Sequence, residues 1–335
     1  MAVPLRRLAA VSLTALILPA TAIAAGSVHS WAQPEIKLVT AQGIFGGTPA
    51  TFRPDDPLTH GALAAALAKL AATPTTTPMD TEAPVSLEQL DRSLVDALGL
   101  RDSAYLFYRA ASAAGTSPPR RFGSEVVARL LGLRLNHPAG HDGLGLQPQQ
   151  PATRAEAAYS LAQILRFEAA PDWSPVEQVK EAAASFQLPA LTTWQRQILA
   201  TAFSYVGYPY VWGGTGDGSA GFDCSGFVWQ VYKLTTYPDE GDLAGVLRGR
   251  TTTELSGEVP RAQRIAAAAL EPGDVMFFGR GPRSKPAQID HAAIYLGNGW
   301  LVQSSGYGVA LAPFDGWYRS SFAWARRPLA EAGLG

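Results

Sequence analysis

The chain has 335 residues, of which 47% are hydrophobic and 16% are charged, a composition typical of globular rather than disordered proteins. This length predicts two or three domains, each large enough for a core of its own. With 27 basic and 28 acidic residues the net charge is −1, so no basic face is implied and nucleic acid is not an expected partner.

Residues 1–24 have the organisation of a signal peptide. Arg6 and Arg7 precede an apolar run over residues 8–18, and Ala22-Ile23-Ala24-Ala25 then provides a small-residue cleavage site. The run is much shorter than the roughly 20 residues that a membrane-spanning helix needs, so we favour a signal peptide over an anchor. We therefore expect an extracytoplasmic protein, secreted or located in the cell envelope, without stable membrane insertion.

Three helical stretches in residues 28–170 begin in the same way, with a proline two residues before a Ser or Thr. These openings are Pro57-Leu58-Thr59, Pro84-Val85-Ser86 and Pro151-Ala152-Thr153. The Ser or Thr is suited to cap a helix, and the apolar residues that follow recur every three or four positions. Repetition on this scale predicts stacked units, since no single unit buries its apolar face alone.

The repeats resemble the S-layer homology module of bacterial surface proteins. Thr153-Arg154-Ala155-Glu156 matches the signature tetrapeptide of that family, whereas Thr59-His60-Gly61-Ala62 and the helix opening at Ser86 depart from it. The resemblance implies a mostly helical domain that holds wall-linked polysaccharide through basic and polar side chains, with Arg154 as the candidate glycan-binding residue. A degenerate spacer packed against the enzyme is the alternative.

Residues 171–192 are predicted to be a linker with a short helix, and residues 193–328 to be one compact unit. Thr193 is suited to cap a helix that runs to about Tyr205, and Gly207-Tyr208-Pro209 then ends it. We expect the long segment from Leu234 to Arg264 to border a cleft in this unit and to shape its specificity.

The chain has one cysteine, Cys224, which follows a glycine-rich loop and opens a helical pattern of apolar residues. The partial positive charge and free N–H groups of a helix start favour the thiolate there. In an exported protein a single cysteine is either an intermolecular link or a reactive group. A buried inert thiol is the alternative, and the surrounding sequence favours reactivity.

The candidate base is His291, the only histidine beyond residue 141. Residues 289–296 alternate like a strand, and Gly297-Asn298-Gly299 predicts a turn into a returning strand. If that turn is three residues long, Gln303 pairs with Ala293 and lies on the face of His291, where its amide could fix the imidazole tautomer. A shift of one residue would place Gln303 on the opposite face.

Several other side chains have competing interpretations. Asp274 is interpreted as a structural turn residue rather than a third catalytic group. His137 and His141 could face one way on a helix and bind a metal, but the Pro138 and Gly140 between them favour two exposed loop histidines. Trp212 and Trp229 are explained by core packing as well as by ligand stacking. Ser225 lacks the G-x-S-x-G context of a serine hydrolase.

Taken in order, the segments 207–227, 270–278 and 290–299 resemble the NlpC/P60 peptidases, papain-like enzymes that cut bacterial cell-wall stem peptides. The resemblance implies an α+β catalytic domain with an antiparallel sheet and the catalytic cysteine at a helix N-terminus, and requires no metal or other cofactor. It implies that Cys224 is the nucleophile, His291 the general base and Gln303 the third polar group. It also implies that Tyr210 supports the oxyanion and that Asp223 and Ser225 bind the substrate.

The resemblance further implies the substrate and the mechanism. The expected partner is the peptidoglycan stem peptide, cleaved through a covalent thioester, and the expected bond joins γ-D-glutamate to a diamino acid. Two alternatives remain open: a wall-binding protein that kept the fold without catalysis, and an amidase or acyltransferase that uses the same thiol.

Overall fold

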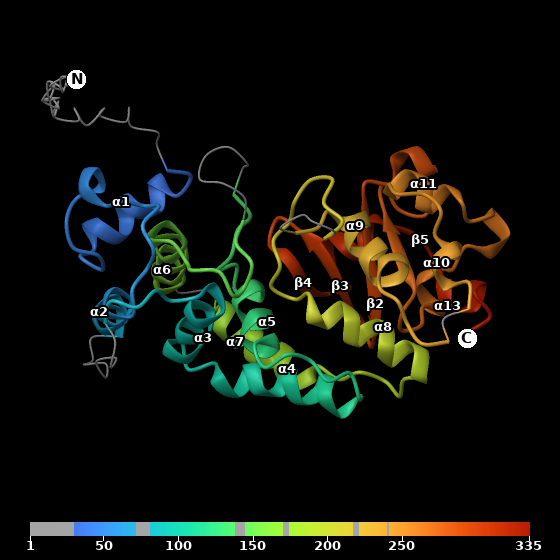
Figure 1. Cartoon of the computed structure of the whole chain (residues 1–335), viewed down its shortest axis with the longest axis horizontal. Coiled ribbons are helices and arrows are strands. Elements are labelled where there is room, and N and C mark those ends of the chain that lie inside the picture. Colours follow the sequence, from blue (N-terminus) through green and yellow to red (C-terminus); the bar gives the residue numbers. More distant parts are fainter. Residues whose placement is uncertain (1–29, 72–80, 138–144, 170–173, 217–220, 240) are drawn as a thin grey trace, which may run out of the picture.

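The computed structural model describes residues 30–71, 81–137, 145–169, 174–216, 221–239 and 241–335. The predicted signal peptide and His141 lie outside these residues. The amino-terminal half is helical, and the carboxy-terminal half contains a sheet with helices around it (Figure 1). The helices of the first half are α1 (Gln33–Ala41), α2 (His60–Ala71), α3 (Leu87–Ala97), α4 (Arg101–Ala113), α5 (Phe122–Leu130), α6 (Arg154–Glu168) and α7 (Pro175–Ser185).

The three predicted helix openings meet in a closed ring of backbone hydrogen bonds. Leu58 N donates to Ala152 O, Ala152 N to Val85 O, and Val85 N to Leu58 O, each at 2.8 Å. Each of these residues is the middle one of its Pro-x-Ser/Thr opening, and α2, α3 and α6 start immediately after the three openings. The predicted capping side chains Thr59, Ser86 and Thr153 all accept a hydrogen bond from the first turn of their helix. The three stretches are therefore equivalent units of one assembly.

Three described helices of this half, α1, α4 and α5, were not predicted. Helix α5 is buried around almost its whole circumference, including Glu125 and Arg129, which sequence patterns place on an exposed face. It lies very close to α4 at Gly123, where a Cβ atom would be 1.9 Å from the carbonyl oxygen of Ala104. Only glycine permits this approach of the two backbones.

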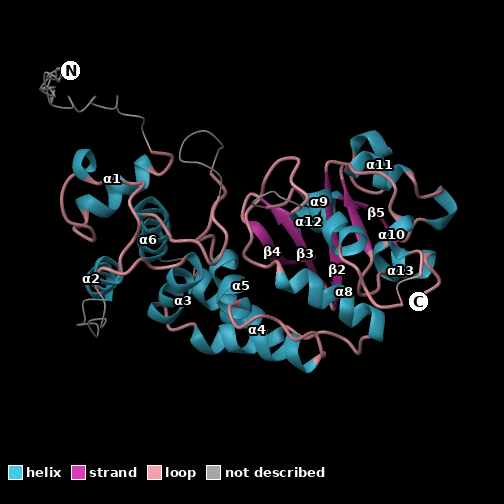
Figure 2. Ribbon diagram, in the orientation of Figure 1, coloured by secondary structure: helices cyan, strands magenta, loops and turns pink. Residues whose placement is uncertain are grey.

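The carboxy-terminal half is built on a five-stranded antiparallel sheet of order β4-β3-β2-β1-β5 (Figure 2). This α+β architecture agrees with the prediction. Its strands are β1 (Val275–Phe278), β2 (His291–Gly297), β3 (Trp300–Ser305), β4 (Gly308–Pro313) and β5 (Phe322–Arg326). Its helices are α8 (Thr193–Ser204), α9 (Cys224–Trp229), α10 (Leu243–Val246), α11 (Thr252–Gly257), α12 (Gly316–Ser321) and α13 (Pro328–Glu331).

The start of α8 differs slightly from the prediction. Its cap is Thr192, not Thr193, because the Thr192 hydroxyl accepts from Gln195 N at 3.2 Å and the Gln195 side chain accepts from Thr192 N in return. This reciprocal capping box satisfies two N–H groups that the helix leaves free. The prediction placed the cap one residue late because two threonines are adjacent.

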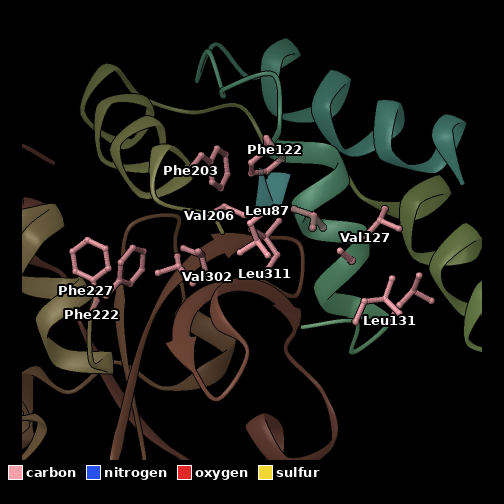
Figure 3. Packing of buried hydrophobic residues seen from close by; sticks show 14 of the residues in the cluster. Leu87, Phe122, Val127, Leu131, Phe203, Val206, Phe222, Phe227, Val302 and Leu311 are labelled. Atoms are coloured by element: carbon pink, nitrogen blue, oxygen red, sulfur yellow. The ribbon is translucent and has the colours of Figure 1, made fainter. Parts of the chain in front are cut away.

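The two halves share one hydrophobic core. Helix α5 packs against β4, the sheet edge nearest to the helical half, and Phe122 of α5 contacts Phe203 of α8 with ring centroids 4.8 Å apart. Figure 3 shows Phe122 and Phe203 facing each other close to Val206 and to Leu311 of β4, with Val127 of α5 farther along the same cluster. The predicted linker is also part of the fold, since α7 packs along α4. The helical units are therefore not a separately tethered domain.

Candidate active site

Cys224 is the first residue of α9, as predicted, and the residue is 8% exposed. The residue before it, Asp223, caps the helix by accepting from Gly226 N at 2.5 Å. Ser304 on β3 fixes the same segment, because its hydroxyl donates to Phe222 O at 2.8 Å. Gly226 permits a close contact here, since a Cβ atom would lie 1.9 Å from Gly214 O. The sheet and the glycine-rich loop therefore both set the position of the thiol.

The thiol lies against the backbone on both sides of His291. Its Sγ is 4.0 Å from the carbonyl oxygen of Asp290, and the N–H of Ala292 is close enough to favour the thiolate. Helix α9 packs on β2, the strand that His291 begins. The structure therefore brings together the two residues that the sequence pairs as nucleophile and base, 67 positions apart in the numbering.

Gln303 is found on the predicted face. It pairs with Ala293, and a bulge between Tyr295 and Gly297 gives the hairpin the register expected for a three-residue turn. His291 Nε2 and Gln303 Oε1 are both buried and have no hydrogen-bond partner within the described part of the chain. The Gln303 amide is close enough to raise the pKa of His291, although His291 Nε2 and Gln303 Oε1 do not reach hydrogen-bond geometry. The Nε2 of Gln303 donates instead to Ser305 Oγ at 3.0 Å.

Burial dominates the electrostatics of this pair. It raises the pKa of the Cys224 thiol to about 11, against the opposing effect of the N–H groups of Ala292, Ser225 and Cys224 itself. It lowers the pKa of His291 to about 4, although the residue as a whole is only partly buried. The helix start therefore favours the thiolate as predicted, but less than burial opposes it. The resting pair is a neutral thiol beside a neutral imidazole.

Aromatic side chains enclose His291 on the side away from α9. Its ring centroid is 5.7 Å from that of Phe278, 6.0 Å from that of Trp317 and 6.3 Å from that of Tyr318. Trp317 of α12 is 53% exposed and Trp212, in the loop before Cys224, is 88% exposed. Core packing therefore does not account for Trp212, and Trp229 is engaged elsewhere, donating from Nε1 to Gly249 O.

Tyr210, the predicted oxyanion support, lies in the strap Gly207–Tyr210 that precedes the glycine-rich loop. Burial, together with the neighbouring Cys224 and Asp223, raises its pKa to about 12. The phenol therefore stays protonated across the physiological range and can donate a hydrogen bond. Its strap is joined to β4, since Gly207 N donates to Val309 O and Val309 N to Tyr208 O.

Asp223 and Ser225, the predicted substrate ligands, are bound by Arg250. The guanidinium donates to Asp223 Oδ1 at 3.1 Å and Oδ2 at 2.9 Å, and to Ser225 Oγ at 2.8 Å. Arg250 was not singled out from the sequence, since it lies in the segment from Leu234 to Arg264 whose fold the sequence left open. Thr252, in the same segment, donates to Ile289 O at 2.9 Å. This part of the segment borders the site, as expected.

Two further predictions can be compared with the structure. Asp274 is structural, because it is buried, accepts from Glu271 N at 2.8 Å and pairs with Arg327. His137 is not an exposed loop residue: it is 5% exposed, stacks on Trp31 and lies 3.5 Å from Glu156. His137 does lie in a loop, as predicted, but the predicted exposure is wrong because its ring packs into the helical units. Within the described residues, no group of three or more His, Cys, Asp or Glu side chains is arranged to hold a metal.

Arg154 lies in a groove between the first and third helical units. Its Nε donates to Phe52 O at 2.9 Å, and its guanidinium lies over the rings of Phe45 and Phe52, 5.1 and 4.7 Å from their centroids. A cavity of about 330 Å³ opens beside it, lined also by Arg53 and Asp56. Burial lowers the pKa of Arg154. The predicted glycan-binding residue therefore faces a space that a ligand could enter.

Comparison with known proteins identifies both parts. Residues 207–327 match the NlpC/P60 family and residues 25–64 match the S-layer homology domain, so the chain contains an NlpC/P60 domain and S-layer homology sequence. The S-layer match extends over α1 and the first residues of α2. No helix within the described residues has the length and apolar character needed to cross a membrane.

Part of the chain is similar in sequence to curated endopeptidases. It is 34% identical over 122 residues to the bifunctional muramidase/DL-endopeptidase CwlT of Bacillus subtilis and 37% identical over 102 residues to the murein DD-endopeptidase MepH of Escherichia coli. These matches cover 36% and 30% of this chain, and 32% of each relative. A solved NlpC/P60 family protein from Bacillus cereus aligns with 26% identity and a TM-score of 0.33, over 43% of this chain and 42% of that one.

Proposed function

We propose that this chain is a peptidoglycan endopeptidase that uses Cys224 as its nucleophile and acts in the cell envelope after export. The observation that carries the proposal is the placement of the only cysteine at the start of α9, against the backbone on either side of His291. The similarity of residues 207–327 to wall endopeptidases supports the substrate class. We propose the γ-D-glutamyl–diamino acid amide as the bond.

In the proposed reaction, the substrate binds next to the neutral thiol of Cys224 and the neutral imidazole of His291 and displaces water from them. His291 takes the proton of Cys224 while Sγ attacks the amide carbonyl, and Tyr210 with the backbone N–H of Cys224 stabilises the oxyanion. The C–N bond breaks as His291 returns that proton to the leaving amine, which leaves a thioester on Cys224. Water, deprotonated by His291, then attacks the thioester and releases the acid and the thiol.

Gln303 and Arg250 have supporting roles in this proposal. The buried Oε1 of Gln303 accepts the imidazole N–H that faces it, which leaves the other ring nitrogen free to take the thiol proton, and this hydrogen bond strengthens once His291 is charged. An ammonium group of a substrate would have to displace Arg250 from Asp223 and Ser225. We therefore propose that these three residues chiefly fix the loop in front of Cys224, with amine binding as their predicted alternative role.

The amino-terminal units supply a second proposed activity, retention on the wall. The groove beside Arg154 combines a guanidinium with two aromatic rings, a set of groups suited to an anionic glycan. The partner proposed here is wall-linked polysaccharide.

The experiment compares residues 25–335 with the Cys224→Ala variant on defined muropeptides, with products identified by mass spectrometry. Cleavage between D-glutamate and the diamino acid by the wild type alone is the expected result. A chain that cleaves no stem peptide but transfers an acyl group, or releases ammonia from an amidated peptide, would replace the proposal by the acyltransferase or amidase alternative. A chain with no thiol-dependent activity that still binds sacculi would favour the wall-binding alternative.

A further inference from the structure

The strap Gly207–Tyr210, which carries the proposed oxyanion tyrosine, is attached at both ends to the helical half of the molecule. At its first residue, Arg129 of α5 donates from Nη2 to Gly207 O at 2.7 Å. At its last residue, Tyr210 N donates to the side-chain oxygen of Asn136 at 3.0 Å. Gly207 has φ +102°, and a Cβ atom there would lie 2.7 Å from Glu125. The strap is therefore fitted closely to the helical half.

Asn136 also contacts the turn between β3 and β4. Its backbone N–H donates to Gly306 O at 2.6 Å, in the turn that follows Gln303 and Ser305 on β3. One residue of the helical half thus connects the Tyr210 strap with the end of the strand that carries Gln303. The segments it joins are more than 90 residues apart in the sequence.

Buried charges hold the helices from which these contacts come. Arg129 pairs with Glu125 and lies 3.7 Å from Asp91, and Arg134, two residues before Asn136, pairs with Asp91 and with Glu156 of the signature tetrapeptide. Charges with this degree of burial are costly to separate, because each one left without its partner loses its compensation. The network gives the helical half a fixed surface on which the strap rests.

From these contacts we propose that Asn136 is a positioning residue for the reaction, which acts by holding the backbone of Tyr210. The phenol of Tyr210 can stabilise an oxyanion only if its backbone is held in place, and Asn136 provides the acceptor for its amide. The inference rests on the proposed function. It makes the helical units a structural component of the catalytic site and not only an attachment to the wall.

The variant Asn136→Ala, made in residues 25–335, removes the acceptor, and Asn136→Asp retains one. We expect Asn136→Ala to lower kcat about tenfold with KM nearly unchanged. The loss should be smaller than the roughly 10²–10³-fold loss that follows removal of an oxyanion donor, because the Tyr210 phenol is still present but less well positioned. Asn136→Asp should recover most of the rate. Asn298→Gly is the matched control, since Asn298 also joins two distant segments, through Gln187 O, but away from the site and at φ +49°, which glycine adopts freely.

A double-mutant cycle separates positioning from general stability. In a Tyr210→Phe background, Asn136→Ala should cost less than twofold more, because the group it positions is already absent. Equal tenfold losses in both backgrounds would overturn the proposal, as would an Asn136→Ala enzyme with wild-type kcat. Thermal unfolding identifies any variant that has lost its fold.

Amide hydrogen exchange provides a readout that does not depend on the substrate. The Tyr210 amide should be protected in the wild type and exchange at least tenfold faster in Asn136→Ala, while Val309, in the adjacent ladder, stays protected. If the wild type cleaves no stem peptide, the proposed function fails, and unchanged Tyr210 exchange would independently remove the role of Asn136. Cleavage by the wild type with unaffected Asn136→Ala kinetics leaves the function intact and removes only the positioning role.

Discussion

At the scale of single residues, the protonation states of Cys224 and His291 decide how the site works. Burial raises the pKa of the thiol to about 11 and lowers that of the imidazole to about 4, so neither is charged near neutral pH. An ion pair at rest would react quickly with alkylating reagents, whereas this pair should react slowly until a substrate arrives. Slow alkylation at pH 7 is therefore no argument against catalysis, and product analysis is the more decisive test.

The depressed pKa of His291 sets the acid limit of activity. Because the base must be neutral, and its pKa in the folded protein lies below the ordinary 6.5, activity should persist on acidification and be lost only as the pH falls through about 4. Gln303 raises that pKa, so Gln303→Ala should move the limit to lower pH and reduce kcat, while Gln303→His should retain both more closely. The measurement is the pH dependence of kcat/KM from pH 3.5 to 9.

Circular dichroism at each pH separates loss of protonation from acid unfolding in this measurement. An acid limit near pH 6.5 that does not change in Gln303→Ala would contradict the assigned roles of both residues.

At the scale of elements, the sequence predicted correctly those positions that depend on residue type and strand alternation within one segment. Cys224 at a helix start and Gln303 opposite Ala293 follow from residue type and strand alternation, and the structure agrees with both. Arg250 could not be found in this way, because it reaches Asp223 across a segment of short helices whose path depends on tertiary contacts. Asn136 was equally inaccessible: its two partners lie in other elements, and no local pattern records them.

The groove between the first and third helical units gives a prediction for wall binding. In a Cys224→Ala background, which prevents digestion of the wall, Arg154→Ala should weaken sedimentation with purified sacculi about tenfold, since one charge-assisted contact is lost. Arg166→Ala is the matched control: it lies on the same helix, 44% exposed, and pairs with Glu35 instead of facing the groove. Equal binding by both variants would favour the spacer interpretation of these units.

At the scale of the whole molecule, the helical units and the NlpC/P60 domain are joined by a continuous core. Breaker residues at 171–192 predicted a linker with a short helix, and α7 lies within that range; the sequence pattern did not show that this helix packs on α4. Proline and glycine in the sequence indicate where the chain turns, but they do not indicate which helix surfaces are buried against each other. The contact of α5 with β4 depends on shapes formed by distant segments, and for that reason no boundary signal reveals it.

This shared core predicts that the chain unfolds as one unit. Phe122 is fully buried between α5 and α8, and Phe122→Ala should cost about 3–5 kcal/mol of unfolding free energy. If the halves depend on each other, calorimetry and tryptophan fluorescence should give a single coincident transition that moves to lower temperature in this variant. The exposed Tyr105 provides the control, since Tyr105→Ala should change stability by no more than about 0.5 kcal/mol. Two transitions, of which Phe122→Ala moves only one, would instead describe independent domains, and the Tyr210 strap would then lack the fixed support on which its positioning depends.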